Sequence, residues 1–113
     1  MDLEAKKYLS DIAKSAGLIE SFTDRKNLAD YESDAMLRSA VERQFEIIGE
    51  ALVHLAQIDS AAAARISLYR RIIAFRNILI HGYTDVDDRI VWDVVKSNLP
   101  VLRDDVTVLL RED

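Results

Sequence analysis

Residues 34–57 read DAMLRSAVERQFEIIGEALVHLAQ, and the spacing of the apolar residues in this stretch decides the fold class. The spacing places them on one face of an α-helix. This face consists of Leu37, Ala40, Val41, Phe45, Ile48, Leu52 and Leu55. Ser33 or Asp34 can cap the start of the helix, which is expected to end near Gln57. Gly49 in mid-helix costs about 1 kcal/mol relative to alanine, so it predicts a close approach by another helix backbone.

The sequence before this stretch predicts a first helix from about Leu3 to about Ser21. One stripe of this helix is apolar and consists of Ala5, Leu9, Ile12, Ala16 and Ile19. The polar residues 23–27 then predict a connection between the two helices.

Three further helices are predicted after residue 57. Asp59 and Ser60 can start a short alanine-rich helix, and Ser67 can cap a helix that Gly82 ends. Thr84 and Asp87 resemble a capping box for a last helix, from about Asp85 to about Leu110. Pro100 lies inside that last helix and is expected to kink or split it.

Four long amphipathic helices with short connections predict an all-α fold, an up-and-down four-helix bundle with a short extra helix. The 113 residues are interpreted as a single domain, 1–113. The chain contains no cysteine, which excludes disulfides and thiolate metal sites. The first residues have no apolar signal core, and we expect a cytoplasmic protein.

The charge is distributed unevenly along the chain. The net charge of −5 argues against a broad nucleic-acid surface. However, residues 60–84 contain four arginines (Arg65, Arg70, Arg71 and Arg76) and no aspartate or glutamate. An acidic body with one basic segment indicates a local anion site, although helix packing alone could also have excluded acids from this segment.

Residues 76–83, RNILIHGY, gather the groups that phosphate chemistry needs. Arg76 can hold a phosphate with two hydrogen bonds, and His81 can transfer protons near neutral pH. Asn77 can orient His81 or donate to a phosphate oxygen, and Tyr83 can stack on a base. An arginine and a histidine on one helix can also be purely structural.

A helical wheel separates these groups. Ile72, Phe75, Ile78 and Leu79 share a sector that can face the core, whereas Arg76 and His81 lie about 140° apart. Three arrangements could still join them. The arginine side chain could curl around the helix, the helix could loosen near Gly82, or the arginine of one subunit could act with the histidine of another.

Ile73 and Ile80 form a second apolar strip between Arg76 and Asn77 on the wheel. A two-fold partner could cover this strip, and a homodimer would then pool two sets of Arg76, Asn77 and His81. Alternatively, Ile73 and Ile80 lie under the last helix.

The spacing Arg-x4-His-x-Tyr resembles the signature of the HEPN superfamily, in particular the HepT ribonuclease toxins of bacterial and archaeal toxin-antitoxin pairs. Residues 47–52 (IIGEAL) resemble the family's helix before the motif, and residues 86–88, 91–95 and 98–100 resemble the segment after it. The likeness spans roughly residues 33–102.

This resemblance implies a metal-independent ribonuclease that acts on tRNA or mRNA as a homodimer, without a cofactor. It implies Arg76 and His81 as catalytic residues and Asn77 as a supporting residue. It also implies that a small nucleotidyltransferase antitoxin transfers AMP onto Tyr83. Arg70 and Arg71 are candidates for contacts with RNA phosphates. Two other interpretations stay open: a noncatalytic module that binds a nucleotide or presents Tyr83 to a transferase, and a helical adaptor whose function lies in its dimer face.

His54 shares one helix face with Glu46 and Glu50, at successive spacings of four residues. Three such side chains could suggest a metal site, but no second cluster completes a coordination shell. We therefore expect a glutamate–histidine pair and no metal.

Overall fold

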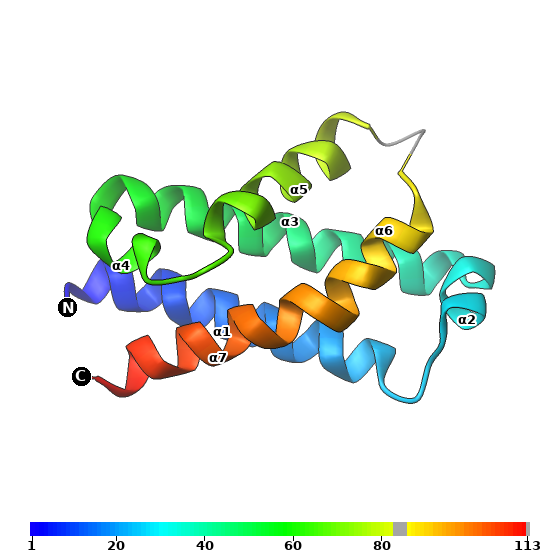
Figure 1. Ribbon diagram of the computed structural model, residues 1–113, viewed down its shortest axis with the longest axis horizontal. Coiled ribbons are helices and arrows are strands. Elements are labelled where there is room, and N and C mark those ends of the chain that lie inside the picture. Colours follow the sequence, from blue (N-terminus) through cyan, green and yellow to red (C-terminus); the bar gives the residue numbers. More distant parts are fainter. Residues whose placement is uncertain (83–85, 113) are drawn as a thin grey trace.

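The structure is a computed structural model that describes residues 1–82 and 86–112 (Figure 1). Within these ranges it contains helices and no strand, as the apolar spacing predicted. The helices are α1 (Leu3–Thr23), α2 (Leu28–Ser33), α3 (Ala35–Ile58), α4 (Ser60–Ala64), α5 (Tyr69–His81), α6 (Asp88–Asp93), the π-helical turn η1 (Val94–Asn98) and α7 (Leu99–Arg111). The prediction of an all-α helical bundle is confirmed.

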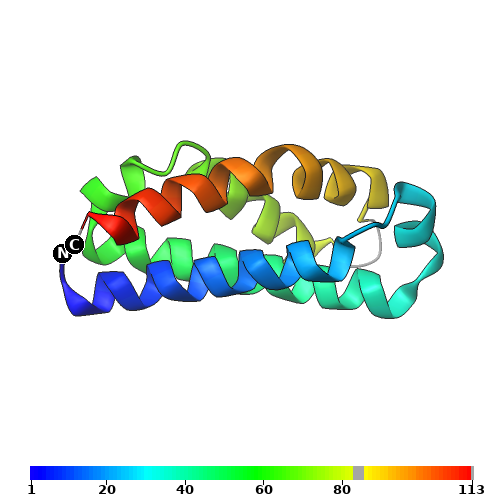
Figure 2. The same cartoon turned by 90° about the horizontal axis from the view of Figure 1, so that it is seen from below.

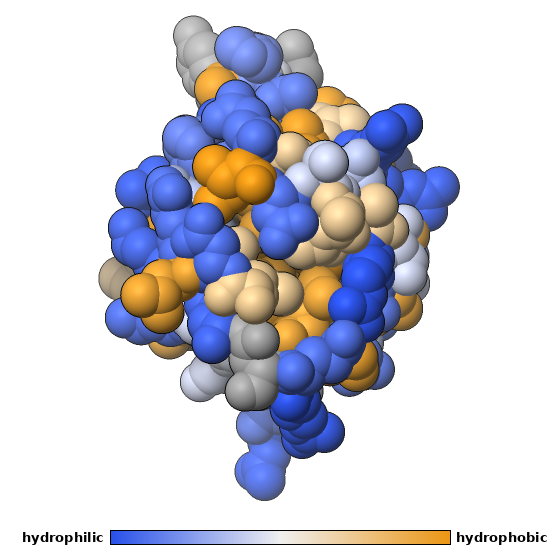
Figure 3. All heavy atoms as spheres, turned by 90° about the vertical axis from the view of Figure 1, so that its left-hand side faces the viewer, coloured by the Kyte–Doolittle hydropathy of each residue, from blue (hydrophilic) through white to orange (hydrophobic). Residues whose placement is uncertain are grey.

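The long helices run up and down along the bundle. α3 packs against both α1 and α5, and α7 packs against α1. α6, η1 and α7 follow one another as a single bent rod, so the chain has four long helical segments (Figure 1). Both termini lie at the same end of the molecule (Figure 2). That end shows mostly hydrophilic side chains with smaller hydrophobic areas between them (Figure 3).

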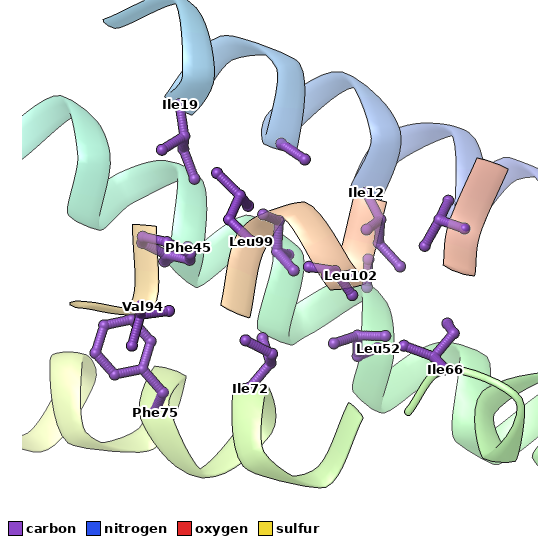
Figure 4. Packing of buried hydrophobic residues seen from close by; sticks show 14 of the residues in the cluster. Ile12, Ile19, Phe45, Leu52, Ile66, Ile72, Phe75, Val94, Leu99 and Leu102 are labelled. Carbon is purple, nitrogen blue, oxygen red and sulfur yellow. The ribbon is translucent and has the colours of Figure 1, made fainter. Parts of the chain in front are cut away.

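The core lies between the four long segments (Figure 4). All five residues of the predicted α1 stripe are fully buried. The predicted α3 stripe is buried as well, except for the half-buried Ala40. Phe45 of α3 meets Phe75 of α5 edge to face, with ring centroids 5.1 Å apart. Each buried aliphatic or aromatic side chain of this kind contributes about 1.5–3 kcal/mol.

An additional short helix, α2, lies between the predicted connection at residues 23–27 and α3, and the apolar spacing did not indicate it. Asn27 and Asp30 form a capping box, in which Asn27 Oδ1 accepts from Asp30 N at 2.8 Å and Asn27 N donates to Asp30 Oδ2 at 2.9 Å. Tyr31 buries its ring completely. Six residues are too few to display a helical period, so the signal lay in the capping residues alone.

Side-chain caps fix two of the predicted helix starts. Asp34 Oδ1 accepts from Leu37 N at 3.1 Å and starts α3, as predicted. Asp59 Oδ1 accepts from Ala62 N at 3.0 Å and starts α4. The end of α3 at Ile58 lies one residue beyond the expected end.

The prediction that Ser67 caps the motif helix is wrong. α5 begins at Tyr69, and its N-cap residue Leu68 makes no side-chain cap. Ser67 instead donates from its backbone N (2.9 Å) and its hydroxyl (2.8 Å) to Asp105 Oδ2 on α7. An acceptor from a distant helix therefore holds Ser67 away from the helix start.

Gly82 ends α5, as predicted, and its N–H donates to Ile78 O at 2.7 Å. Its φ of −109° is not left-handed. The glycine is needed for a different reason, because a Cβ at this position would lie 2.9 Å from Ile78 O. Tyr83, Thr84 and Asp85, with the roles predicted for them, lie outside the described residues.

The last helical segment begins later than expected. Val86 and Asp87 are not helical, and Asp87 Oδ1 caps α6 by accepting from Arg89 N at 2.9 Å. The predicted interruption at Pro100 is confirmed. Pro100 lies in the first turn of α7, where its missing N–H is harmless, and the preceding turn is π-helical, with Leu99 N bonded to Val94 O.

Among the helices of the described ranges, none is long and apolar enough to cross a membrane.

Candidate functional site

The core-facing side of α5 is narrower than the helical wheel predicted. Ile72, Phe75 and Leu79 are buried, as expected. Ile78 was placed on the same face, but its side chain is 55% exposed, so that prediction is wrong. α5 packs mainly against α3, and one such contact covers only part of a helix circumference.

The outward side of α5 is basic and polar. Its exposed residues are Arg70, Arg71, Ala74, Asn77, Ile78 and His81. No acid occurs on α5 or in the segment that leads from α4 into it. Four of the predicted site residues (Arg70, Arg71, Asn77 and His81) therefore share one open surface, which we call the α5 outer face.

Arg76 lies on a different side of α5, over α3. A Cβ built on Gly49 would lie 2.3 Å from Arg76 Cβ and 2.4 Å from its Cγ, so the arginine stem occupies the space that the glycine leaves. α5 thus approaches α3 closely at Gly49, as predicted, but the nearest atoms belong to the Arg76 side chain and not to the helix backbone. The arginine side chain is only 22% exposed, and its Nε is buried without a hydrogen-bond partner among the described residues.

Two acceptors hold the Arg76 guanidinium. Nη2 donates to Glu50 Oε2 in a salt bridge between α5 and α3. Nη1 donates to Asn77 Oδ1 at 2.9 Å. Asn77 is one helical turn before His81 on the α5 outer face, so the guanidinium is turned part of the way toward that face.

The described residues do not bring Arg76 and His81 together. His81 is exposed at the last helical position, whereas Arg76 is held against α3. The helix does not loosen before Gly82, because the Gly82 N–H still reaches Ile78 O. Of the three arrangements that the sequence left open, the described residues show neither an Arg76 side chain that reaches His81 nor a loosened helix end, which leaves cooperation between two subunits.

A pocket of about 440 Å³ opens between α1, α3 and α5, beside Arg76. Its lining mixes charges of both signs with an aromatic ring and includes Tyr8, Arg43, Glu46, Glu50, His54 and Ile80. Glu46 faces Arg43 at 4.0 Å. His81 is not part of this lining.

His54 and Glu50 form the glutamate–histidine pair that their spacing predicted. His54 Nε2 lies 3.1 Å from Glu50 Oε1, and its ring stacks on Tyr8 with centroids 5.3 Å apart and an interplanar angle of 15°. The sequence did not reveal that Glu50 also binds Arg76. The signal was available at Gly49, because an acid next to a predicted close approach can reach the approaching helix.

The second apolar strip is only partly open. Ile73 is half-buried and packs against the chain's own core, so it does not depend on a two-fold partner for cover. Ile80 is 37% exposed at the rim of the pocket. The exposed large apolar residues of α5 are therefore Ile78 and Ile80.

Comparison with known proteins gives a consistent result. A family model described as Ribonuclease HepT-like matches residues 12–109. A protein of Thermococcus cleftensis named "Probable ribonuclease HepT" is 38% identical over 98 residues, which cover 87% of this chain and 88% of that protein. A "Putative RNase" of Methanocaldococcus jannaschii is 30% identical over 106 residues, which cover 94% of this chain and 96% of that protein.

A longer protein of Methanocaldococcus jannaschii is also similar. It is named "Gamma-glutamylcyclotransferase and putative RNase" and is 34% identical over 112 residues. The match covers 99% of this chain, which spans 50% of the length of that relative. No solved structure matches the chain.

Proposed function

The chain belongs to the Ribonuclease HepT-like family, and on this premise we propose that it is a metal-independent RNA endonuclease that acts as the toxin of a toxin-antitoxin pair. The observation that carries the proposal is the α5 outer face. This face presents a histidine, an asparagine and two arginines to solvent on an acid-free helix of an otherwise acidic chain. RNA cleavage needs proton transfer and cationic stabilisation of a phosphorane, and these side chains can supply both.

His81 is the proposed proton-transfer residue. A positioned imidazole that removes the 2′-hydroxyl proton or protonates the leaving oxygen typically accelerates such a step by about 10²–10⁴. Its exposure on the outer face leaves it accessible to an RNA strand.

Arg76 is the proposed second catalytic residue and would stabilise the charge that develops on the phosphorane, an effect worth roughly a few kcal/mol. Asn77 supports it through the hydrogen bond to Nη1. Arg70 and Arg71 are proposed to contact neighbouring RNA phosphates, since both are exposed on the same face.

We place the active site between two copies of the chain. Arg76 and His81 diverge on one helix, but a two-fold contact between α5 helices can bring Arg76 of one copy near His81 of the other. Ile78, which is 55% exposed on the α5 outer face, would supply an apolar part of that contact.

For regulation, we propose that a cognate nucleotidyltransferase antitoxin transfers AMP onto Tyr83. Tyr83 follows His81 by two residues in the sequence, so a nucleotide attached to it would lie near the proposed site. Its phosphate would compete with RNA for the same cations, which accounts for inhibition without a conformational switch.

Cleavage of RNA by purified protein in the presence of a chelator tests the activity. The wild type should cleave, and His81→Ala and Arg76→Ala should lose most of the activity while remaining folded. Arg111→Ala removes an exposed arginine from the far end of α7 and should cleave like the wild type. If His81→Ala is as active as the wild type, His81 is not the proton-transfer residue.

Co-expression with a cognate nucleotidyltransferase antitoxin tests the regulation. The intact mass should rise by one AMP group, peptide mapping should place it on Tyr83, and the modified protein should no longer cleave RNA. The Tyr83→Phe variant should gain no mass on co-expression and should still cleave RNA. Modification at a different tyrosine would contradict the assignment.

A second candidate function is a noncatalytic module that binds a nucleotide or the transferase. The observation in its favour is that Glu50 already neutralises Arg76 in the described arrangement. This candidate predicts that rigorously purified wild-type protein cleaves no RNA but still binds its nucleotide or its partner.

A further inference from the structure

The Arg76 side chain is largely buried, and its guanidinium is held in place by a counter-charge from α3. Its stem fills the gap above Gly49, and the side chain is 22% exposed. A guanidinium that has lost most of its water needs a counter-charge and hydrogen-bond acceptors. Glu50, the residue after Gly49, supplies both from the same turn of α3.

Glu50 itself is held from two sides. Its Oε2 accepts from Arg76, and its Oε1 lies 3.1 Å from His54 Nε2. The His54 ring in turn stacks on Tyr8 of α1. Side chains of three helices, α1, α3 and α5, therefore restrict how this carboxylate can turn.

The contacts also determine which edge of Arg76 a phosphate can use. Nε is buried, so the edge formed by Nε and Nη2 is closed to a ligand. Nη1 donates to Asn77 and Nη2 donates to Glu50, and each nitrogen carries a second N–H. Only these remaining donors can meet an RNA phosphate, and their direction depends on Glu50.

We propose that Glu50 is a positioning residue that aims the Arg76 guanidinium at the reacting phosphate, and that His54, supported by Tyr8, holds Glu50 in place. This inference rests on the proposed ribonuclease function. Glu50 acts through Arg76 and does not itself touch RNA. Its loss should therefore reduce the rate of the chemical step more than the affinity for RNA.

A purely competitive role for Glu50 predicts the opposite result. If Glu50 only competed with the phosphate for Arg76, its removal would free the arginine and speed cleavage. Removing a negative charge favours RNA binding in both cases, so affinity alone does not separate the two roles. The turnover rate separates them.

The first measurement does not depend on catalysis. Phenylglyoxal labelling of Arg76, followed by peptide mass spectrometry, should be several-fold faster in Glu50→Ala than in the wild type. Glu46→Gln serves as the control, because Glu46 lies one turn earlier on α3 and faces Arg43 instead. In Glu46→Gln, phenylglyoxal should label Arg76 at the wild-type rate. An unchanged labelling rate in Glu50→Ala would overturn the proposal.

The second measurement compares kcat and KM for RNA cleavage. Glu50→Ala should lower kcat at least tenfold without raising KM, and Glu50→Gln, which keeps one acceptor, should retain more activity. His54→Phe keeps the stack on Tyr8 but loses the contact to Glu50, and should show a smaller fall in kcat. Glu46→Gln should cleave like the wild type.

Circular dichroism must show that each variant is folded, so that a loss of helical structure is not mistaken for a loss of Arg76 positioning. An unchanged or higher kcat in folded Glu50→Ala would overturn the positioning role. If the wild type cleaves no RNA at all, the proposed function fails, and the labelling rates still decide whether Glu50 holds Arg76.

Discussion

Gly17 and Gly49 both lie inside long helices, but only at Gly49 does another helix approach closely. A Cβ at Gly17 would have Arg103 Nη2 at 4.0 Å as its nearest neighbour, whereas a Cβ at Gly49 would collide with the stem of Arg76. The sequence predicted a close approach at Gly49. It could not identify the neighbour, because helical spacing within one helix does not determine which residue of another helix packs against it.

Alanine at these two positions should have opposite effects on stability. Gly17→Ala should raise the free energy of unfolding by up to about 1 kcal/mol, from helix propensity. Gly49→Ala has the same propensity gain, but it forces α5 away from α3 and should be net destabilising by roughly 1–2 kcal/mol. Urea denaturation followed by circular dichroism measures both. A stabilised Gly49→Ala would show that α5 does not pack on α3 in this way.

At the scale of elements, the long helices and the caps at Asp34 and Asp59 were predictable, but the start of α5 was not. Apolar spacing located α1 and α3 to within two residues at each end. The start of α5 was missed because Asp105, 38 residues away in the chain, takes both donors of Ser67. A contact of that kind has no signature in the neighbouring sequence.

Asp105 should therefore matter for the stability of the α5 start. Asp105→Ala loses two hydrogen bonds to Ser67 and should lower the free energy of unfolding by about 1–2 kcal/mol. Asp104→Ala changes the exposed neighbour and should have little effect. Thermal and urea denaturation would measure the difference, and equal stabilities of the two variants would contradict the anchoring role.

The junction of α3 with α2 and α6 contains an unfavourable charge. Burial raises the pKa of the Glu42 carboxyl, and the nearby acids Asp88 and Glu46 raise it further, although Arg38 opposes them. A raised pKa in the folded state means that ionised Glu42 destabilises the fold. The penalty is absent below the unfolded-state pKa of 4.5 and is complete once the pH exceeds the folded-state pKa.

Glu42→Gln should consequently raise the unfolding temperature at pH 7 relative to the wild type. The difference should shrink as the pH is lowered toward 4, where both states of the wild type become protonated. Melting curves of the two proteins across this pH range provide the measurement. A variant that is less stable than the wild type at pH 7 would show that Glu42 is favourably paired.

At the scale of the whole molecule, the bundle was predictable because four long apolar stripes need one another for burial. The arrangement of the site was less accessible from the sequence. The wheel correctly separated Arg76 from His81, but it misplaced Ile78, and it gave no indication of the pocket beside Arg76. The pocket forms only where α1, α3 and α5 meet, and that meeting depends on packing across the whole chain.

The proposed dimer can be tested with two equally exposed isoleucines. Ile78 on α5 and Ile90 on α6 are both 55% exposed. Ile78→Glu should convert a dimer to a monomer in sedimentation velocity at micromolar concentration, with little loss of thermal stability. Ile90→Glu should remain dimeric. A dimer that survives Ile78→Glu unchanged would place the contact elsewhere.

The central claim, that Arg76 and His81 form a ribonuclease site across two copies of the chain, is tested most directly by mixing two inactive variants. Arg76→Ala and His81→Ala are unfolded together, refolded and assayed on RNA in chelator. In a shared site, each mixed dimer regains one complete pair, so random pairing should restore about a quarter of the wild-type rate. No recovery, with mixed dimers shown to form, would contradict a site shared between subunits.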